Sequence, residues 1–312
     1  MEAILSAKAE PQSLNVYLTS RCNQRCPFCR RQKNNGMDTL AKKDFTPALA
    51  EEILKRFPSI QTVCIAGFGE PLLSPELYPI IGIFKRTGRK VEVITNGVLL
   101  KEHASRLIDA KVDFLSVSVN AADQTERLAV TGTDSWGSLI SGLRDVLGSG
   151  MTVATSFVIS KQNWIRIPQY AQAMQAIGVR FVDFHNTLPH SEHPDDLYQF
   201  ESETILDTDA NVIQALTLFR KNPFSAVVRN WPTPTPTVAP QNSKCRSPFF
   251  TLGVDGDGNC TACSRIYGPG TMPANLSDPG FWSGNAFERF RKALMGQAER
   301  PTLCAKCWGN LK

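Results

Sequence analysis

The sequence predicts an α/β fold built on a parallel sheet, because short β-branched segments alternate with amphipathic segments from residue 14 to about residue 186. Such strand–helix units imply right-handed crossovers. A doubly wound sheet and a partial barrel both fit this alternation. Polar and glycine-rich motifs directly follow several strands, as expected when loops at the C-terminal ends of barrel strands build a site. We therefore expect a partial barrel.

Each element is expected from its own pattern of residues. The expected strands are Asn15–Thr19, Thr62–Ala66, Lys90–Thr95, Phe114–Val119, Thr152–Ile159 and Arg180–Asn186. The expected helices between them are Pro47–Phe57, Pro75–Thr87, Lys101–Ala110, Ser135–Ser149 and Trp164–Ile177. A further helix from about Asp209 to Lys221 is expected to close the barrel domain.

The composition is that of an ordinary globular protein, with 42% hydrophobic and 20% charged residues among 312. Lys and Arg number 34 and Asp and Glu 29, an excess of five without a run of like charges, so no nucleic-acid partner is expected. No signal-peptide pattern opens the chain, and its apolar runs are far shorter than the ~20 residues that span a bilayer. We expect a cytoplasmic protein that does not contact membranes.

Two domains are expected from the length and from a change in composition. The barrel should occupy residues 1–221, and residues 222–244 should form a proline-rich linker. Residues 245–312 would form a small cysteine-rich domain, since five of the nine cysteines lie there. Cysteines in a chain without a secretion signal favour metal or catalytic use over disulfides.

Three cysteines follow the first expected strand at C-x3-C-x2-C spacing, namely Cys22, Cys26 and Cys29. A loop with this spacing can bring three thiolates to one iron–sulfur cube and leave one iron without a protein ligand. A small molecule with an amine and a carboxylate could chelate that iron. The alternatives are a zinc knuckle or three unconnected buried cysteines. A structural zinc ion needs four closed ligands, and no His or fourth Cys lies nearby.

Around these cysteines the chain resembles the radical S-adenosylmethionine (SAM) superfamily. Phe28 fits the aromatic position of the Cx3CxΦC motif, and Gly67-Phe68-Gly69-Glu70-Pro71 resembles the Gly-Gly-Glu-Pro loop with Phe68 replacing one residue. Thr95-Asn96-Gly97 and Ser116–Asn120 resemble the strand ends that follow. The resemblance implies a partial (β/α)6 TIM barrel, a [4Fe-4S] cluster on the three cysteines, and SAM as a cofactor.

The resemblance also implies which residues bind SAM. Gly67, Gly69, Glu70 and Pro71 would form the loop that receives the SAM amino group, since glycines allow close backbone approach. Ser118 and Asn120, two apart on one strand, would contact the ribose, although many relatives carry Asp where Asn120 stands. The alternative for this pair is a purely structural role at the strand end.

Two further strand ends carry polar residues. Asn96 could contact SAM or substrate, or could serve the Asn-Gly turn that it begins. His185 and Asn186 end the sixth expected strand, where a substrate contact would be reasonable, but a lone His is more often structural. Cys64, inside a strand expected to be buried, is interpreted as a small core residue.

The C-terminal cysteines have two interpretations. Cys260-x2-Cys263 with Cys304-x2-Cys307 has zinc-ribbon spacing and would suit an interaction protein. The order Cys245, x17, Cys263, x40, Cys304, x2, Cys307 instead resembles the SPASM or Twitch modules of radical SAM enzymes. That resemblance implies one auxiliary [4Fe-4S] cluster with four Cys ligands. In layout the chain resembles the 2-deoxy-scyllo-inosamine dehydrogenases, Twitch enzymes that oxidise an alcohol.

The implied reaction begins with hydrogen abstraction from a substrate by a 5′-deoxyadenosyl radical. Oxidation follows if the auxiliary cluster accepts the substrate electron, and this is the leading hypothesis. Cys260 could be an alternative ligand, a packing residue or a thiol that returns a hydrogen atom in an epimerase. Modification of a ribosomal peptide is a third option, although only about 14 residues precede the first strand. A small-molecule or peptide substrate and a flavodoxin or ferredoxin electron donor are the expected partners.

Overall fold

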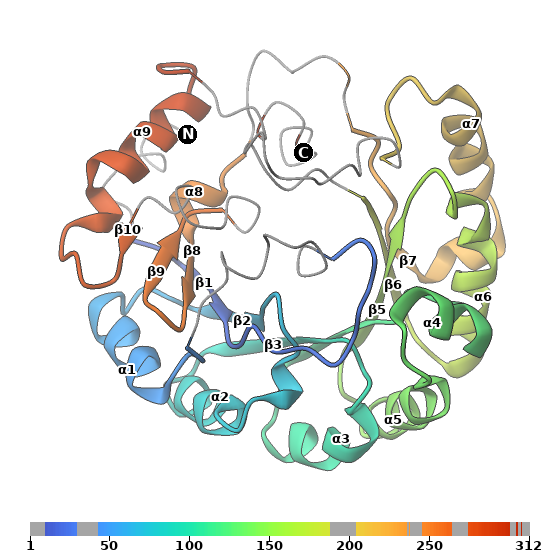
Figure 1. Cartoon of the computed structure of the whole chain (residues 1–312), viewed down its shortest axis with the longest axis horizontal. Helices are drawn as coiled ribbons and strands as arrows, with labels where there is room; N and C mark the ends of the chain where they lie inside the picture. Colours follow the sequence, from blue (N-terminus) through green and yellow to red (C-terminus); the bar gives the residue numbers. More distant parts are fainter. Residues whose placement is uncertain are drawn as a thin grey trace.

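The structure is a computed structural model of the chain, and it describes residues 10–29, 43–187, 204–235, 237, 245–263, 274–299, 304 and 307. Parallel strands line the inside of an open ring and helices surround them (Figure 1). The strands of the barrel are β1 (Ser13–Tyr17), β2 (Thr62–Ala66), β3 (Lys90–Thr95), β4 (Phe114–Ser118), β5 (Val153–Ile159) and β6 (Phe181–Asn186). The predicted partial barrel is therefore confirmed.

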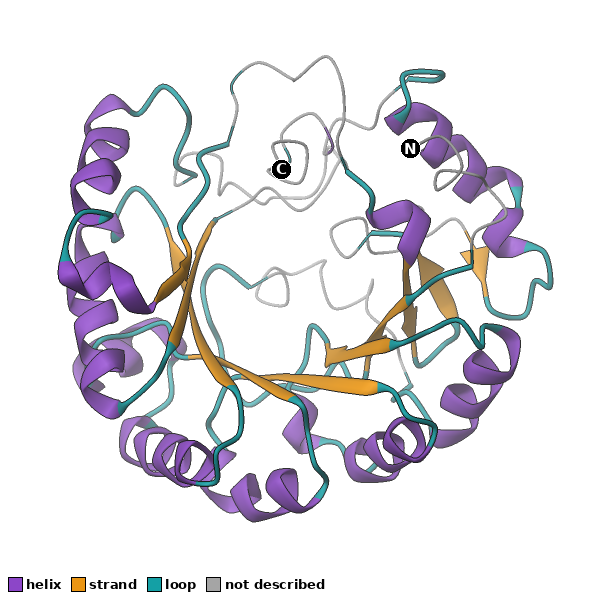
Figure 2. Ribbon diagram, turned by 180° about the vertical axis from the view of Figure 1, so that it is seen from behind, coloured by secondary structure: helices purple, strands orange, loops and turns teal. Residues whose placement is uncertain are grey.

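Helices cover the convex face of this sheet, as Figure 2 shows from behind. They are α1 (Pro47–Arg56), α2 (Leu77–Arg86), α3 (Leu100–Asp109), α4 (Gln124–Thr131), α5 (Trp136–Gly148), α6 (Ile167–Ile177) and α7 (Ala210–Phe219). Short 3-10 turns form η3 (Pro71–Leu73), η4 (Trp164–Arg166), η6 (Pro223–Val227) and η7 (Phe281–Ser283). Helix α4 was not predicted, and α6 begins three residues after its predicted start because η4 occupies those residues; the other α-helices and barrel strands lie within two residues of their predicted bounds. No helix among the described residues combines the length and apolarity needed to cross a bilayer.

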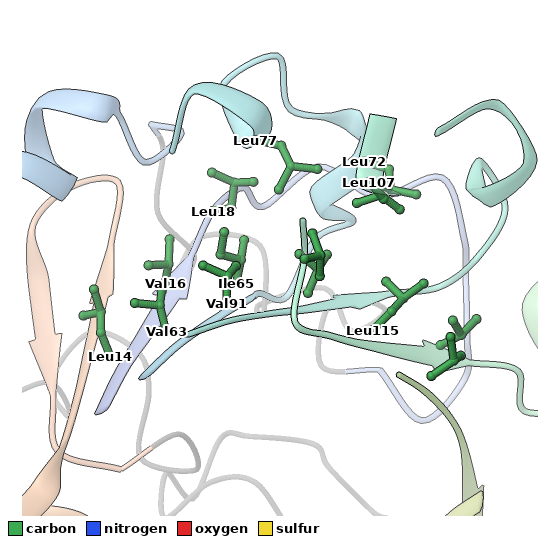
Figure 3. Close-up of a cluster of buried hydrophobic side chains, with 14 of the residues drawn as sticks. Leu14, Val16, Leu18, Val63, Ile65, Leu72, Leu77, Val91, Leu107 and Leu115 are labelled. Atoms are coloured by element: carbon green, nitrogen blue, oxygen red, sulfur yellow. The ribbon is translucent and has the colours of Figure 1, made fainter. Parts of the chain in front are cut away.

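The main core lies between the sheet and the helices. Alternate residues of each strand point to opposite faces of a sheet. Val16 of β1, Ile65 of β2 and Leu115 of β4 therefore point to the same layer, where all three are fully buried (Figure 3). Full burial of such a side chain stabilises the fold by about 1.5–3 kcal/mol. The opposite, concave face carries the intervening residues, which are mostly polar.

The barrel sheet continues at both edges into later parts of the chain. On one side β7 (Val228–Asn230) runs parallel to β6. On the other side β8 (Thr251–Asp255) runs parallel to β1, with Ser13 opposite Thr251. Strands β9 (Asn259–Thr261) and β10 (Ala274–Asn275) follow in antiparallel order. The start of the cysteine-rich segment is therefore joined to the same sheet as the barrel.

Part of the predicted linker belongs to the barrel. Residues of η6 and β7 lie within 222–244, and the Trp231 ring packs near Phe184 and Phe224. Thr235 makes a bridge with Leu206. Proline tolerates extended positions at a sheet edge, which is compatible with this placement. Residues 236 and 238–244 lie outside the described residues, so the linker and the three-part division remain predictions.

The C-terminal segment contains two described helices, α8 (Ser247–Phe250) and α9 (Asn285–Leu294). Arg291 of α9 is buried and donates from Nε to the Pro248 carbonyl at 2.8 Å and from Nη1 to the Trp282 carbonyl at 2.6 Å. Its guanidinium lies 4.4 Å from the centre of the Trp282 ring. This side chain fastens α9 to α8 and η7.

Candidate cluster and cofactor site

The loop after β1 brings together the N-terminal thiol group, which we define as Cys22, Cys26 and Cys29. The Cys29 amide donates to the Cys26 carbonyl at 3.0 Å, which closes a turn between two of the cysteines. The Arg25 amide donates to the Thr131 carbonyl at the end of α4, also at 3.0 Å. Cys26 is buried, whereas Cys22 and Cys29 are partly exposed. The loop is thus held at its middle and opens toward solvent at its ends.

The thiols of this group are close enough to influence one another. The pKa of Cys26 is raised to about 12, first by burial and then by the neighbouring Cys29 and Cys22 sulfurs, while Arg127 opposes the shift. No three His, Cys, Asp or Glu side chains converge on a single-ion position in the described parts of the chain. A cubane cluster does not require such convergence, because each thiolate binds a different iron. Thiolate ligands, partial burial and a nearby cation fit a [4Fe-4S] cluster.

The Gly67–Pro71 loop docks directly on the backbone that leads into the cysteine loop. The Gly69 amide donates to the Thr19 carbonyl at 3.1 Å, and the Glu70 amide donates to the Arg21 carbonyl at 2.7 Å. A Cβ at Gly69 would lie 2.3 Å from the Arg21 oxygen, so only glycine fits. The close approach expected of this loop is therefore made to the protein's own chain. Pro71 is buried and begins η3.

Glu70 is a buried support of the site. Its carboxylate accepts hydrogen bonds from Thr95 Oγ1 at 2.7 Å, from the Leu72 amide at 3.0 Å and from the Asn96 amide at 2.6 Å. Burial raises the pKa of Glu70, and these three donors together with Arg127 oppose that rise. The side chain is 1% exposed, so it positions the ends of β2 and β3.

Asn96 reaches the cysteine loop itself. Its Nδ2 donates to Asn23 Oδ1 at 2.8 Å and lies 3.6 Å from Cys22 Sγ. Its Oδ1 accepts from the Val98 amide at 2.9 Å. The positive φ of this Asn-Gly turn, 77°, belongs to Gly97. Asn96 therefore combines a turn role with a direct link to the cysteine loop.

Arg127 is a central residue that the sequence reasoning missed. It is fully buried on α4 and donates to the carbonyl oxygens of Asn96 at 2.6 Å, Ser118 at 3.0 Å and Val119 at 2.5 Å. Its Nε also donates to Ser135 Oγ at 3.2 Å. One guanidinium thus joins the ends of β3 and β4 beside Cys26.

A helix signal was present around Arg127. Asp123 is the N-cap of α4 and accepts from the Glu126 amide, while Glu126 reaches back to the Ala122 amide. Gly132 ends the helix with φ of 68°. These capping residues predict the helix, but no residue pattern predicts that Arg127 binds three carbonyls.

Ser118 and Asn120 take different roles at the end of β4. Ser118 is partly exposed, and Ser156 Oγ donates to its hydroxyl at 3.3 Å. Asn120 has a positive φ of 54° and accepts through Oδ1 from the Val158 amide at 2.9 Å. The side-chain oxygen of Asn120 therefore joins the end of β4 to β5. Phe28 lies partly buried beside Cys29 in the cysteine loop.

The end of β6 separates its two candidate residues. Asn186 is buried, donates to the Ile205 carbonyl at 2.8 Å and accepts from the Ile205 amide at 3.0 Å. It fixes the segment before α7, so we assign it a structural role. His185 is exposed and points to the opposite, concave side of the strand.

Cys64 and Cys260 are the two cysteines that belong to neither proposed cluster. Cys64 alternates with Val63 and Ile65, so it faces the concave side of β2 opposite Glu92 and is only partly buried. The interpretation as a core residue was wrong. Cys260 is fully buried, donates to the Gly258 carbonyl at 3.4 Å and belongs to the hydrophobic core. The structure favours a packing role for Cys260 over hydrogen donation.

The C-terminal thiol group, which we define as Cys245, Cys263, Cys304 and Cys307, comes from three separate segments. The pKa of Cys245 is raised first by burial, with further contributions from the Cys263 and Cys307 sulfurs, and lowered by the Ser247 amide. The Cys307 amide donates to the Cys304 carbonyl at 3.4 Å. The thiols of Cys245, Cys263 and Cys307 are therefore electrostatic neighbours despite their distance in sequence.

Comparison with known proteins agrees with this geometry. The sequence profile of the Radical SAM superfamily matches residues 16–174, which is half of the chain and includes the cysteine loop. The chain belongs to the radical SAM superfamily.

Curated radical SAM relatives resemble the chain over part of its length. A "Probable GTP 3',8-cyclase" of Saccharolobus islandicus is 31% identical over 200 residues, covering 61% of this chain and 63% of the relative. The protein of the same name from Sulfolobus acidocaldarius is 33% identical over 156 residues, covering 49% of each chain. The chain thus spans less than two thirds of the relatives' length.

Solved radical SAM structures share the fold. Streptococcus suis SuiB superposes with a TM-score of 0.71 at 16% identity, covering 95% of this chain and 77% of SuiB. The anSMEcpe structure with bound AdoMet and the Cp18Cys peptide superposes with a TM-score of 0.68 at 15% identity, covering 96% and 86% of the two chains. At these identities the likeness concerns the fold alone.

Proposed function

We propose that this chain is a radical SAM oxidoreductase with two [4Fe-4S] clusters. Cys22, Cys26 and Cys29 would hold the SAM-binding cluster, and the C-terminal thiol group would hold an auxiliary cluster that accepts the substrate electron. The observation that carries the auxiliary cluster is that the Cys263 and Cys307 sulfurs, from separate segments, are near enough to Cys245 to raise the pKa of its thiol. When bound and reduced, the first cluster supplies the electron that cleaves SAM to methionine and a 5′-deoxyadenosyl radical.

The surrounding residues would each have a defined task. Glu70 and Arg127 would keep the ends of β2, β3 and β4 in place, because Glu70 accepts from Thr95 and the Asn96 amide and Arg127 donates to the Asn96 and Val119 carbonyl oxygens. The backbone carbonyls of the Gly67–Pro71 loop are candidates to receive the SAM ammonium group. Ser118, partly exposed on the concave side, is a candidate to hydrogen-bond the ribose hydroxyls of SAM. The side-chain nitrogen of Asn120 is a second candidate donor to the same hydroxyls. Flavodoxin or ferredoxin is the expected electron donor.

The overall chemistry balances as a two-electron oxidation. The deoxyadenosyl radical removes one hydrogen atom from a substrate carbon, and 5′-deoxyadenosine leaves. The substrate radical would then lose one proton and one electron, and an auxiliary cluster held by Cys245, Cys263, Cys304 and Cys307 would serve as the electron acceptor. An alcohol would become a ketone. We retain this proposal over epimerisation because the fully buried Cys260 thiol packs in the core and bonds to Gly258.

GTP 3',8-cyclase activity is the second candidate, because the relatives carry that name. Among the described residues, the charges on the concave side of β3 and β6 favour a substrate other than a triphosphate. Glu92 of β3 is partly buried there, and no hydrogen bond to its carboxylate is present among the described residues. Arg229 is already paired with the buried Asp183, to which Asn230 also donates at 2.6 Å. These described groups would repel an anion and suit an uncharged or cationic substrate, whether a small molecule or a peptide.

An anaerobic assay tests the proposal. Reconstituted full-length protein with dithionite and SAM should contain about eight irons and release 5′-deoxyadenosine, and Cys26→Ala should abolish that release. Added GTP should not increase turnover or yield a cyclised nucleotide. Once a substrate is found, turnover in deuterated water should leave the product carbon without deuterium. A cyclised nucleotide would establish the second candidate, and deuterium on carbon would establish epimerisation.

A further inference from the structure

Gln24 lies inside the cysteine loop, between Cys22 and Cys26. The side chain is 5% exposed, and its Oε1 accepts from Cys26 Sγ at 3.5 Å. Its Nε2 is buried and has no hydrogen-bond partner among the described residues. A buried amide N–H without an acceptor destabilises the folded protein. A side chain with such a cost, placed next to a cluster ligand, requires an explanation.

The amide orientation offers one. The present arrangement suits a Cys26 that still carries its thiol hydrogen and donates it to Oε1. A thiolate bound to iron has no hydrogen to donate and would repel this oxygen. Rotation of the terminal amide by 180° exchanges Oε1 and Nε2 at nearly the same positions. An N–H group would then face the Cys26 sulfur, and Oε1 would take the buried position that Nε2 now occupies.

Asn96 already shows this arrangement at the neighbouring ligand. Its Nδ2 points at Cys22 Sγ from 3.6 Å and is held there by Asn23 Oδ1 at 2.8 Å. The Asn96 backbone is fixed by Glu70 and Arg127. One amide therefore approaches the sulfur of Cys22, and a second lies beside the sulfur of Cys26.

We propose that Gln24 is a positioning residue whose side-chain amide donates an N–H···S hydrogen bond to the Cys26 thiolate and raises the reduction potential of the SAM-binding cluster. The inference rests on the proposed function in that it requires the N-terminal cluster. The reduced cluster carries one more negative charge than the oxidised cluster, so an N–H donor stabilises it more. Asn96 would act in the same sense on Cys22.

The test is a redox titration of reconstituted full-length protein, followed by electron paramagnetic resonance without substrate. The relevant signal is the one that changes when SAM is added and is lost in Cys26→Ala. Gln24→Leu should lower the reduction potential of the SAM-binding cluster. The expected shift of the equilibrium toward the oxidised cluster is about tenfold, which is ~59 mV for one electron. Gln24→Glu, which offers no N–H when ionised, should lower the potential at least as much. Gln124→Leu changes an exposed glutamine on α4 and should leave the potential unchanged.

A measurement on unmutated protein covers the case in which Gln24→Leu fails to bind iron. Protein labelled with ¹⁵N in its glutamine side chains should show a weak ¹⁵N hyperfine coupling to the SAM-binding cluster in pulsed electron paramagnetic resonance spectra. Its disappearance in Gln24→Glu would assign it. An unchanged potential in iron-loaded Gln24→Leu, or no ¹⁵N coupling in wild type, overturns the proposal. Neither readout depends on SAM cleavage, so a failure here is distinct from a failure of the proposed enzyme activity.

Discussion

The two thiol groups are supported by different kinds of structure. The N-terminal thiol group follows a central strand, and buried polar side chains surround it, with Arg127 and Glu70 holding three strand ends together. The C-terminal thiol group depends on the short strands β8 to β10 at one sheet edge and on the Arg291 contacts. The comparison indicates that the first site is built into the barrel, whereas the second is attached to it.

One turn connects the two regions. A Cβ at Gly256, in the β8–β9 hairpin, would lie 2.0 Å from the Lys43 carbonyl oxygen. The next residue, Asp44, accepts from Thr19 Oγ1 at 2.7 Å and pairs with Arg21 at 2.5 Å, just before the cysteine loop. The C-terminal region therefore contacts the segment beside the N-terminal site through backbone atoms. Substitutions in one region should nevertheless remove the cluster of that region and leave the other cluster in place.

The largest effect is expected from Arg127→Met. The substitution removes the donors to three carbonyl oxygens near the cysteine loop, and it should lower the free energy of unfolding by about 3 kcal/mol or more. Iron at the N-terminal thiol group should be lost before iron at the C-terminal group. Urea unfolding and iron analysis check this. Arg127→Lys should restore little, because an ammonium cannot reproduce the planar fork. Retention of both clusters in Arg127→Met would contradict the contrast between the sites.

Gly256→Ala should have the next largest effect and act on the other region. The added methyl group meets backbone atoms, so the hairpin must shift at a cost of about 1–3 kcal/mol. We expect iron to fall from about eight to about four per chain, with the SAM-responsive cluster signal retained. Gly148→Ala, where a Cβ meets nothing within 4 Å, is the matched control. Loss of the SAM-responsive cluster in preference to the other would reverse the expected order.

Glu70→Gln should have a moderate, pH-dependent effect. The amide turns an N–H group toward one of three donors, and the loss at neutral pH should be about 1–3 kcal/mol. Burial raises the pKa of Glu70 above its ordinary 4.5, so the folded state binds that proton more tightly than the unfolded state. The stabilising contribution of Glu70 therefore declines as the pH rises above 4.5. The deficit of Glu70→Gln relative to wild type should shrink with rising pH in denaturant titrations, and a growing deficit would refute this account.

The smallest effect is expected from Cys260→Ala. Its thiol packs in the hydrophobic core, so the cost should be about 1 kcal/mol of stability. Iron content and 5′-deoxyadenosine release should match wild type. A selective loss of auxiliary-cluster iron would instead show that Cys260 is a ligand, as one interpretation of its spacing allowed.

The sequence predicted the frame of the molecule well, because local patterns determine it. Thr62–Ala66 and Lys90–Thr95 have the predicted bounds, since each alternates buried residues and is flanked by turn residues. The three N-terminal cysteines could be recognised because their spacing is short. Cys64 could also have been placed correctly, since the flanking Val63 and Ile65 put it on the opposite face.

The supporting residues could not be predicted in the same way. Arg127 binds carbonyl oxygens from β3 and β4, and a carbonyl group leaves no mark on residue type. Pairing of β8 with β1 joins segments more than 230 residues apart, which no local period reveals. The buried Gln24 looked like any polar loop residue until its surroundings were visible.

Paired ligand variants test the central claim most directly. Cys26→Ala and Cys263→Ala should be reconstituted with ⁵⁷Fe, and their iron content and Mössbauer spectra compared with wild type. We predict about eight irons in wild type and about four in each variant, with the SAM-responsive cluster absent only from Cys26→Ala. Equal spectra from the two variants, or a wild type with only four irons, would contradict the account of two separate clusters.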